Sequence, residues 1–157
     1  MTERLWAPWR LEYVAGGADQ PGCIFCDRAG DDDLVVHRGR LAFALMNLYP
    51  YSNGHLMIAP YRHVPRPGDL DGAERAEMWE LLDAALGSLS RAMSPDGFNA
   101  GLNLGRVAGA GVEHHLHLHV VPRWNGDTNF MPVLADVKVM PEHITRTAEK
   151  LRAAWGA

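Results

Sequence analysis

The sequence predicts an α+β domain: an antiparallel sheet of about five strands packed against one long helix and a C-terminal helix. Three observations support this prediction. Short apolar runs are separated by turn residues, as in strands. One segment of about 20 residues repeats apolar positions at helical spacing. Another segment alternates histidine with apolar residues at a period of two, which is the period of a strand.

Five segments have the composition and bounds of strands. They are 34–38, 41–48, 55–60, 98–105 and the histidine-rich segment 112–124. Between the second and the third, Asn53-Gly54 is a strong hairpin signal. We therefore expect the second and third strands to pair directly.

The long helix is predicted to begin after Asp71, because Asp71 and Glu74 have the spacing of a capping box. Its apolar residues recur at steps of three and four: Met78, Leu82, Leu86, Leu89 and Met93. The turn residues of 94–97 end it. A second set at the same steps predicts the terminal helix: Ile144, Ala148, Leu151 and Trp155.

Length and charge limit the class of protein. The 157 residues suit one domain, 1–157, with an irregular segment at 1–22 and a core at 23–130. A net charge of −4 argues against a nucleic-acid partner. No signal-peptide pattern opens the chain, and no apolar run approaches the ~18 residues of a membrane span. We expect a cytoplasmic protein without a membrane partner.

The histidine-rich segment has two faces. His115, His117 and His119 share one face, while Leu116, Leu118 and Val120 face the core. Pro122 is expected to end the pairing because it has no N–H to donate. His114 has the parity of the leucines and is interpreted as a solvated residue at the start of the strand.

The histidine face allows three interpretations. It could be an exposed strand face without a function. Two of the histidines could chelate a zinc ion, but His115 and His119 lie about 13 Å apart along a strand, so one metal cannot take all three. Alternatively, a neutral imidazole could act as a nucleophile at phosphorus. The glycines of the preceding loop, Gly105, Gly109 and Gly111, could then turn backbone N–H groups toward an anion.

The two cysteines, Cys23 and Cys26, are the only ones in the chain. A redox pair would need thioredoxin-like surroundings that are missing, and two small buried residues are the plain alternative. A structural zinc site needs four ligands. His63, at the end of a predicted strand, and His115 are the candidates to complete it.

Several of these segments resemble the histidine triad family. The segment from His115 to Val121 matches its motif, in which three histidines alternate with apolar residues. "MNLYPYSNGHLMIAP" is similar to the family's upstream hairpin, and "CIFC" to its zinc-binding branch. The resemblance runs from about Cys23 to Phe130, which is most of the chain.

This resemblance implies a nucleotide-binding α+β fold, usually a homodimer whose sheet continues across the interface. It also implies transfer or hydrolysis of nucleotidyl groups through a covalent nucleotidyl-histidine. By motif position the nucleophile is His117, and His119 contacts the phosphate and assists the leaving group. Asn103 corresponds to a phosphate-side asparagine, and Asn47 to a residue that meets the ribose.

Within the family, "WAPWR" and "VVPRWNGDTNF" are most similar to actinobacterial-type diadenosine tetraphosphate phosphorylases. This likeness implies that Trp124 borders the second nucleotide. Gly111 departs from the pattern, because several members carry a hydroxyl or an amide there. Whether phosphate or water accepts the nucleotidyl group stays open, although the segment after the triad favours phosphate.

Three alternatives to this function remain open. The chain could hydrolyse adenosine phosphoramidates, or bind nucleotides as a non-catalytic adaptor. It could also be a zinc hydrolase that uses His115 and His117 directly as metal ligands.

Overall fold

The computed structural model describes residues 22–30, 32–127 and 141–156. Nearly all of the predicted irregular segment 1–22 lies outside these ranges, as do residues 128–130 of the predicted core. The strands are β1 (Val35–Arg38), β2 (Ala42–Met46), β3 (Leu56–Pro60), β4 (Gly97–Leu102) and β5 (Leu118–Arg123). The helices are α2 (Ile24–Arg28), α3 (Gly72–Met93) and α5 (Ile144–Ala154), with short 3-10 turns η2 (Pro67–Asp69) and η3 (Arg106–Ala108). The predicted α+β fold is confirmed.

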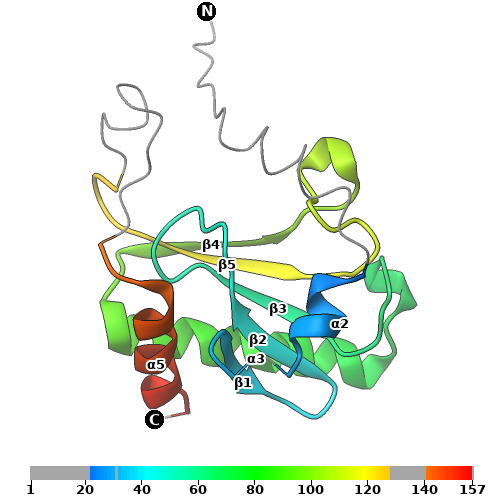
Figure 1. Ribbon diagram of the computed structural model, residues 1–157, viewed down its shortest axis with the longest axis horizontal. Helices are drawn as coiled ribbons and strands as arrows, with labels where there is room; N and C mark the ends of the chain where they lie inside the picture. Colours follow the sequence, from blue (N-terminus) through cyan, green and yellow to red (C-terminus); the bar gives the residue numbers. More distant parts are fainter. Residues whose placement is uncertain (1–21, 31, 128–140, 157) are drawn as a thin grey trace, which may run out of the picture.

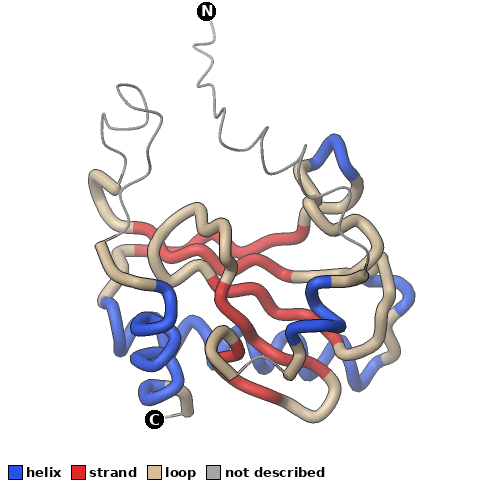
Figure 2. The backbone as a smooth tube through the Cα atoms, viewed as in Figure 1, coloured by secondary structure: helices blue, strands red, loops and turns tan. Residues whose placement is uncertain are grey.

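The strands form one antiparallel sheet in the order β1-β2-β3-β5-β4 (Figure 1). β2 and β3 pair as the hairpin signal predicted. Strand β5 lies between β3 and β4, so residues distant in the sequence flank the histidine segment. Figure 2 shows the strands gathered together, with the helical segments around them.

Each face of the sheet has its own apolar cluster. On one face, buried residues of α3 and α5 pack against side chains of β1, β2, β3 and β5. On the other face, Phe25 of the short helix α2 packs with Val35, Phe43, Leu45 and Met57. Phe25 is fully buried. The five-residue helix α2 is absent from the predicted elements, because it is too short to show a helical period.

Helix α3 begins as predicted. The Glu74 N–H donates to Asp71 Oδ1 at 2.8 Å, and the Asp71 N–H donates back to Glu74 Oε2 at 2.9 Å, which completes the capping box. The helix ends at Ser94, whose φ of 47° is left-handed. Of its periodic apolar residues, Met78 and Leu89 are buried and the others pack partly against the core.

Helix α5 packs against α3 and the β1 edge of the sheet. Ala148 and Leu151 are buried as their spacing predicted. Ser88 in α3 donates its hydroxyl to the Leu151 carbonyl at 2.8 Å. In the described part of the chain, no helix combines the length and apolarity needed to cross a bilayer.

The prediction that Pro122 ends the pairing of the histidine strand is wrong. Pro122 lies inside β5 and pairs with Phe98 of β4. On its other side, β3 pairs with β5 only from Leu118 to Val120. At Pro122 the strand therefore has one neighbour instead of two, and a residue without an N–H is tolerated there as on a sheet edge.

Candidate functional site

The three motif histidines lie along β5 and the extended segment that leads into it. His119 is within β5, opposite Met57 of β3 and Gly101 of β4. His115 and His117 precede the strand. As predicted, the intervening Leu116 and Leu118 face the core of α3 and α5.

The first two histidines of this face are not open to solvent. His115 is 1% exposed and His117 is 6% exposed. The ring of Phe25 lies 5.1 Å from the ring of His115 and 4.7 Å from that of His117. Helix α2 therefore covers this part of the face, and the interpretation as a solvated strand face without a function does not hold for these two residues.

His117 has the geometry of a neutral nucleophile. Its Nδ1 lies 2.8 Å from the His115 carbonyl, which can only accept, so Nδ1 carries the proton. The lone pair is then on Nε2. Burial lowers the pKa of His117 despite the opposing hydrogen bond to the backbone. The imidazole is therefore uncharged near neutral pH, as attack on phosphorus requires.

His119 is oriented by His55, a residue that the sequence-based predictions missed. The Tyr51 N–H donates to His55 Nδ1 at 3.0 Å, so this nitrogen is an acceptor. The neutral His55 ring must then carry its proton on Nε2, which lies 2.9 Å from His119 Nδ1. His119 accepts there, and its own proton is on Nε2.

The result is a candidate nucleophile, His117, next to a hydrogen-bond donor, His119. The rings of His117 and His119 lie 4.8 Å apart, nearly edge to face. Asn103, just after β4, has its side-chain amide 3.5 Å from His119 Nε2. Since Nε2 carries the proton, the amide must present its oxygen, not its NH2 group, to His119. Three of the residues that the sequence singled out are thus brought together, in an arrangement that can hold a phosphoryl group.

Asn47 lies at the end of β2 and faces the turn toward β3. Its side-chain oxygen accepts from the Tyr49 N–H at 3.0 Å, and its amide nitrogen lies 3.4 Å from His55 Nδ1. Asn47 therefore orders the loop that holds His55. Its predicted contact with a ribose stays a prediction.

The glycine-rich loop folds as a tight turn around η3. The N–H groups of Ala108 and Ala110 both donate to the Gly105 carbonyl, and that of Gly109 donates to Arg106. These three N–H groups are used within the loop rather than turned toward an anion. Gly105 and Gly109 have positive φ values of 83° and 86°, whereas Gly111 is not among the glycines with positive φ.

Trp124 lies at the far end of β5 from the triad. It follows the strand's last residue, five positions after His119, which corresponds to about 16 Å along an extended chain. Its N–H donates to Asp127 Oδ2 at 3.3 Å. The fold therefore does not bring Trp124 next to His117, and its contact with a second nucleotide stays a prediction.

The four predicted metal ligands form one cluster. Cys23, Cys26, His63 and His115 each offer a ligand atom, and these atoms all lie within 4.8 Å of one another. His115 Nδ1 is 3.2 Å from the Cys23 sulfur and 3.6 Å from the Cys26 sulfur. His63 Nδ1 is 3.4 Å from the Cys26 sulfur. A tetrahedron with zinc bonds of about 2.0–2.3 Å has edges of roughly 3.3–3.8 Å, so the donor set fits a zinc ion.

The surroundings of this cluster suit metal ligands. The His115 Nε2–H donates to the Pro60 carbonyl at 2.8 Å, which leaves Nδ1 as the ligand atom. Burial and, to a lesser extent, the neighbouring His63 and His117 lower the pKa of His115, which favours its neutral, ligating form. Burial and the Cys23 thiol raise the pKa of the Cys26 thiol. A raised pKa means that the thiolate form is disfavoured in the empty site. A bound cation would offset this by stabilising the two negatively charged thiolates.

This arrangement argues against a zinc hydrolase that uses His115 and His117 as ligands to one metal. Both nitrogens of His115 are committed, one to the cysteines and one to Pro60. His117 is not part of the cluster within the described residues. Its Nδ1 is bound to the backbone, and its ring packs against that of His119, with the ring centres 4.8 Å apart.

Comparisons with known proteins agree with this architecture. Residues 29–126 match the family described as HIT domain. A Mycobacterium tuberculosis protein named AP-4-A phosphorylase is 40% identical over 98% of this chain and 84% of its own length. A Dictyostelium discoideum bis(5'-adenosyl)-triphosphatase is 36% identical over 53% of this chain and 55% of its own length. The crystal structure of a Zn-bound histidine triad family protein from Mycobacterium smegmatis superposes with a TM-score of 0.68, at 25% identity, over 85% of this chain and 92% of that one.

Proposed function

Since the chain belongs to the HIT domain family, we propose that it is an enzyme that cleaves a dinucleoside polyphosphate, such as diadenosine tetraphosphate, by nucleotidyl transfer through His117. The observation that carries the proposal is the orientation of His117. Its Nδ1 is tied to the His115 carbonyl, so its lone pair is on Nε2, and its ring centre lies 4.8 Å from that of His119. The relatives named for such substrates support the choice of substrate.

The first step is in-line attack on an α-phosphorus. The Nε2 lone pair of His117 forms the N–P bond while the bond from phosphorus to the bridging oxygen breaks, and the electron pair leaves with the nucleoside polyphosphate. The hydrogen bond from His119 Nε2–H stabilises charge on the phosphoryl oxygens. Because His119 is neutral in this network, it acts as a hydrogen-bond donor and not as a strong acid. A polyphosphate leaving group can depart as an anion.

The second step releases the nucleotide from His117. Attack by inorganic phosphate on adenylyl-histidine gives ADP, and attack by water gives AMP; the first step has released ATP in both cases. We favour phosphate as the acceptor. The 40% identity with a protein named AP-4-A phosphorylase supports this choice.

We further propose that Cys23, Cys26, His63 and His115 hold a structural zinc ion. The ion would tie α2, the segment after β3 and the start of the histidine segment together. All four protein ligands are supplied, so no open position is left for a reacting water. Its role is therefore to fix His115, whose carbonyl orients the nucleophile.

We propose that two copies assemble through β4. The β1 edge of the sheet is packed against α5, whereas the residues from Asn99 to Leu102 of the edge strand β4 are exposed. Antiparallel pairing of two β4 strands would continue the sheet across a twofold axis. Sedimentation at micromolar concentration should show a dimer, and a monomer would contradict this assembly.

The decisive experiment identifies the products of diadenosine tetraphosphate with and without phosphate. ADP that appears only with phosphate supports phosphorolysis, and AMP without phosphate indicates hydrolysis. Rapid acid-free quenching of the first turnover should trap labelled adenylate on the wild-type chain and none on His117→Ala. Turnover of an adenosine phosphoramidate with no cleavage of the dinucleotide would overturn the proposed substrate. Nucleotide binding without turnover of either compound would indicate an adaptor.

A further inference from the structure

The segment 60–64 contacts both histidines of the metal cluster. The Pro60 carbonyl accepts from His115 Nε2–H at 2.8 Å. The Val64 carbonyl accepts from the Leu116 N–H at 2.7 Å, directly beside His115. His63 itself supplies a ligand atom. The position of this one segment therefore sets two of the four ligands.

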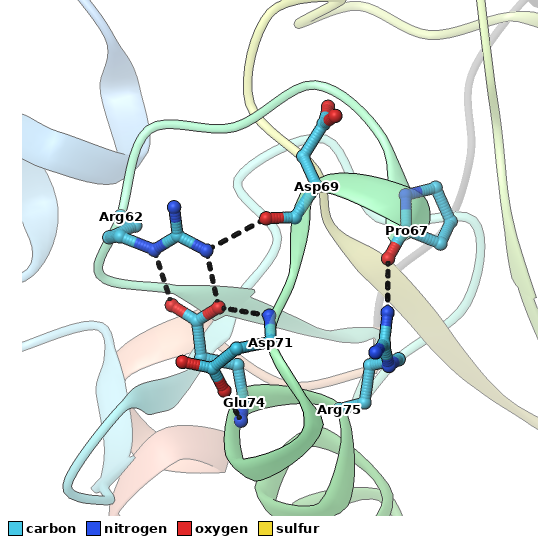
Figure 3. A network of polar contacts seen from close by, with 6 residues as sticks. All are labelled: Arg62, Pro67, Asp69, Asp71, Glu74 and Arg75. Carbon is cyan, nitrogen blue, oxygen red and sulfur yellow. Dashed lines mark hydrogen bonds and ion pairs between the residues drawn. The ribbon is translucent and has the colours of Figure 1, made fainter.

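Arg62, in the middle of the segment, is held by the first turn of α3 (Figure 3). Its Nε donates to Glu74 Oε1 at 2.7 Å, and its Nη2 donates to Glu74 Oε2 at 2.6 Å. The same Nη2 also reaches the Asp69 carbonyl at 2.8 Å. A two-pronged contact of this kind fixes direction as well as distance.

Glu74 is a buried carboxylate with several donors. Its side chain is 4% exposed, whereas that of Arg62 is 54% exposed. The hydrogen bond from Arg62, together with the backbone N–H of Asp71, lowers the pKa of Glu74 to about 2. The charge is therefore present at every physiological pH. Nucleotidyl transfer at His117 makes no use of it.

We propose that the Arg62–Glu74 ion pair is a positioning device for the metal cluster, which holds the segment 60–64 where His63 and His115 can share one zinc ion. The inference rests on the proposed zinc site. Zinc affinity depends on how well ligands are held in place before the ion arrives. Helix α3 packs across three strands of the sheet, so the ion pair connects a loop to the rigid core.

The sharpest variant is Glu74→Gln. Glutamine can still accept from the Asp71 N–H, so the capping box and the start of α3 are kept, while the charge that binds Arg62 is lost. Arg62→Lys keeps the charge but not the two-pronged contact. Arg75→Gln is the matched control, because Arg75 lies in the same turn and, among the described residues, its side chain has a single long hydrogen bond, 3.5 Å, to the Pro67 carbonyl.

The measurements are zinc affinity by competition with a chromophoric chelator, and the free energy of unfolding of the zinc-loaded and zinc-free full chain. We expect zinc affinity to fall about 10–100-fold in Glu74→Gln, as for other residues that orient ligands, and less in Arg62→Lys. Arg75→Gln should match the wild type. In the double variant Arg62→Lys/Glu74→Gln, the loss of zinc affinity should not exceed that of the worse single variant, because both changes break one contact.

A purely structural ion pair gives another result. Equal stability losses with and without zinc, at unchanged zinc affinity, would overturn the proposal while the zinc site stands. A wild-type chain that binds no zinc would overturn the zinc site, and this inference with it. If Glu74→Gln does not fold, Arg62→Lys decides the question, since half of the arginine side chain is in solvent.

Discussion

The Nε2 of His55 lies 2.9 Å from the Nδ1 of His119, although the two residues are 64 positions apart in the sequence. The contact joins the residue before β3 to the second residue of β5. The Tyr51 N–H donates to His55, and His55 in turn donates to His119, so one backbone N–H orients both imidazoles. The tautomer of His119 is thereby set by the main chain of a turn.

Replacement of His55 should show this effect. In His55→Leu, His119 loses its fixed tautomer, and we expect kcat to fall about 10–100-fold, as for other residues that orient a functional histidine. His55→Gln can place an amide N–H near the lost Nε2–H and should recover part of the rate. Steady-state kinetics of both variants would test this, and equal rates in the two would contradict a role for the donor.

Removal of the nucleophile should abolish turnover. His117→Ala is expected to lose at least ~10³-fold in kcat, since no neighbouring group replaces the covalent intermediate. His119→Ala should be milder, within ~10²–10⁴-fold, and should still form the adduct. His117 packs against Phe25, so thermal unfolding should be measured in parallel. Substantial activity in a folded His117→Ala would contradict the mechanism.

Metal removal should destabilise the chain. We expect about one zinc per chain by elemental analysis of protein purified without added zinc. Cys23→Ala should lose the metal and lower the unfolding temperature, while excess chelator should produce the same change in the wild type and none in the variant. Retention of zinc by a Cys23→Ala/Cys26→Ala double variant would refute the ligand set.

Glu74 should contribute to acid unfolding. Its pKa in the folded chain is about 2, below the ordinary value of 4.5. A lowered carboxyl pKa means that the stabilisation is present above pH 4.5 and is lost as the pH falls toward 2. The stability difference between the zinc-free wild type and Glu74→Gln should therefore be constant near neutral pH and shrink below pH 4.5. A difference independent of pH would contradict the assignment.

Gly109 and Gly111, which precede the three histidines, should differ in how well they tolerate substitution by alanine. Gly109 has a φ of 86°, so Gly109→Ala should strain the loop by about 1–2 kcal/mol and weaken AMP binding. Gly111 does not have a positive φ, so Gly111→Ala should bind AMP with nearly wild-type affinity. Calorimetry compares the two. Equal affinities would show that the loop's conformation is not needed for binding.

Strong local signals made much of the fold predictable from the sequence. The capping box at Asp71 and Glu74 and the run of apolar residues after it fixed the long helix within a residue or two. The alternation of histidines and leucines fixed which side of β5 meets α3. The clustering of Cys23, Cys26, His63 and His115 was also predictable, because a pair of thiols and a pair of imidazoles at strand ends form a common zinc-binding set.

Contacts between distant segments were not predictable in the same way. His55 reads as an ordinary first residue of a strand, and only the pairing of β3 with β5 brings it to His119. The contact of Phe25 with His115 and His117 could not be predicted, because the helix that carries Phe25 is shorter than two turns and shows no helical period. The prediction for Pro122 was wrong because a strand tolerates proline wherever one neighbouring strand has already ended. The sequence does not show how far β3 extends along β5.

Because β5 lies between two other strands, the proposed activity depends on the correct alignment of β5 with its neighbours. A shift of β5 by one residue against its neighbours would exchange its two faces. The imidazoles would then face the apolar core beneath α3, and the leucines would take their place on the face that α2 covers. Such a molecule could keep its overall shape while losing the proposed zinc site and the proposed nucleophile together. Molecules with a misaligned β5 would therefore have no activity rather than reduced activity.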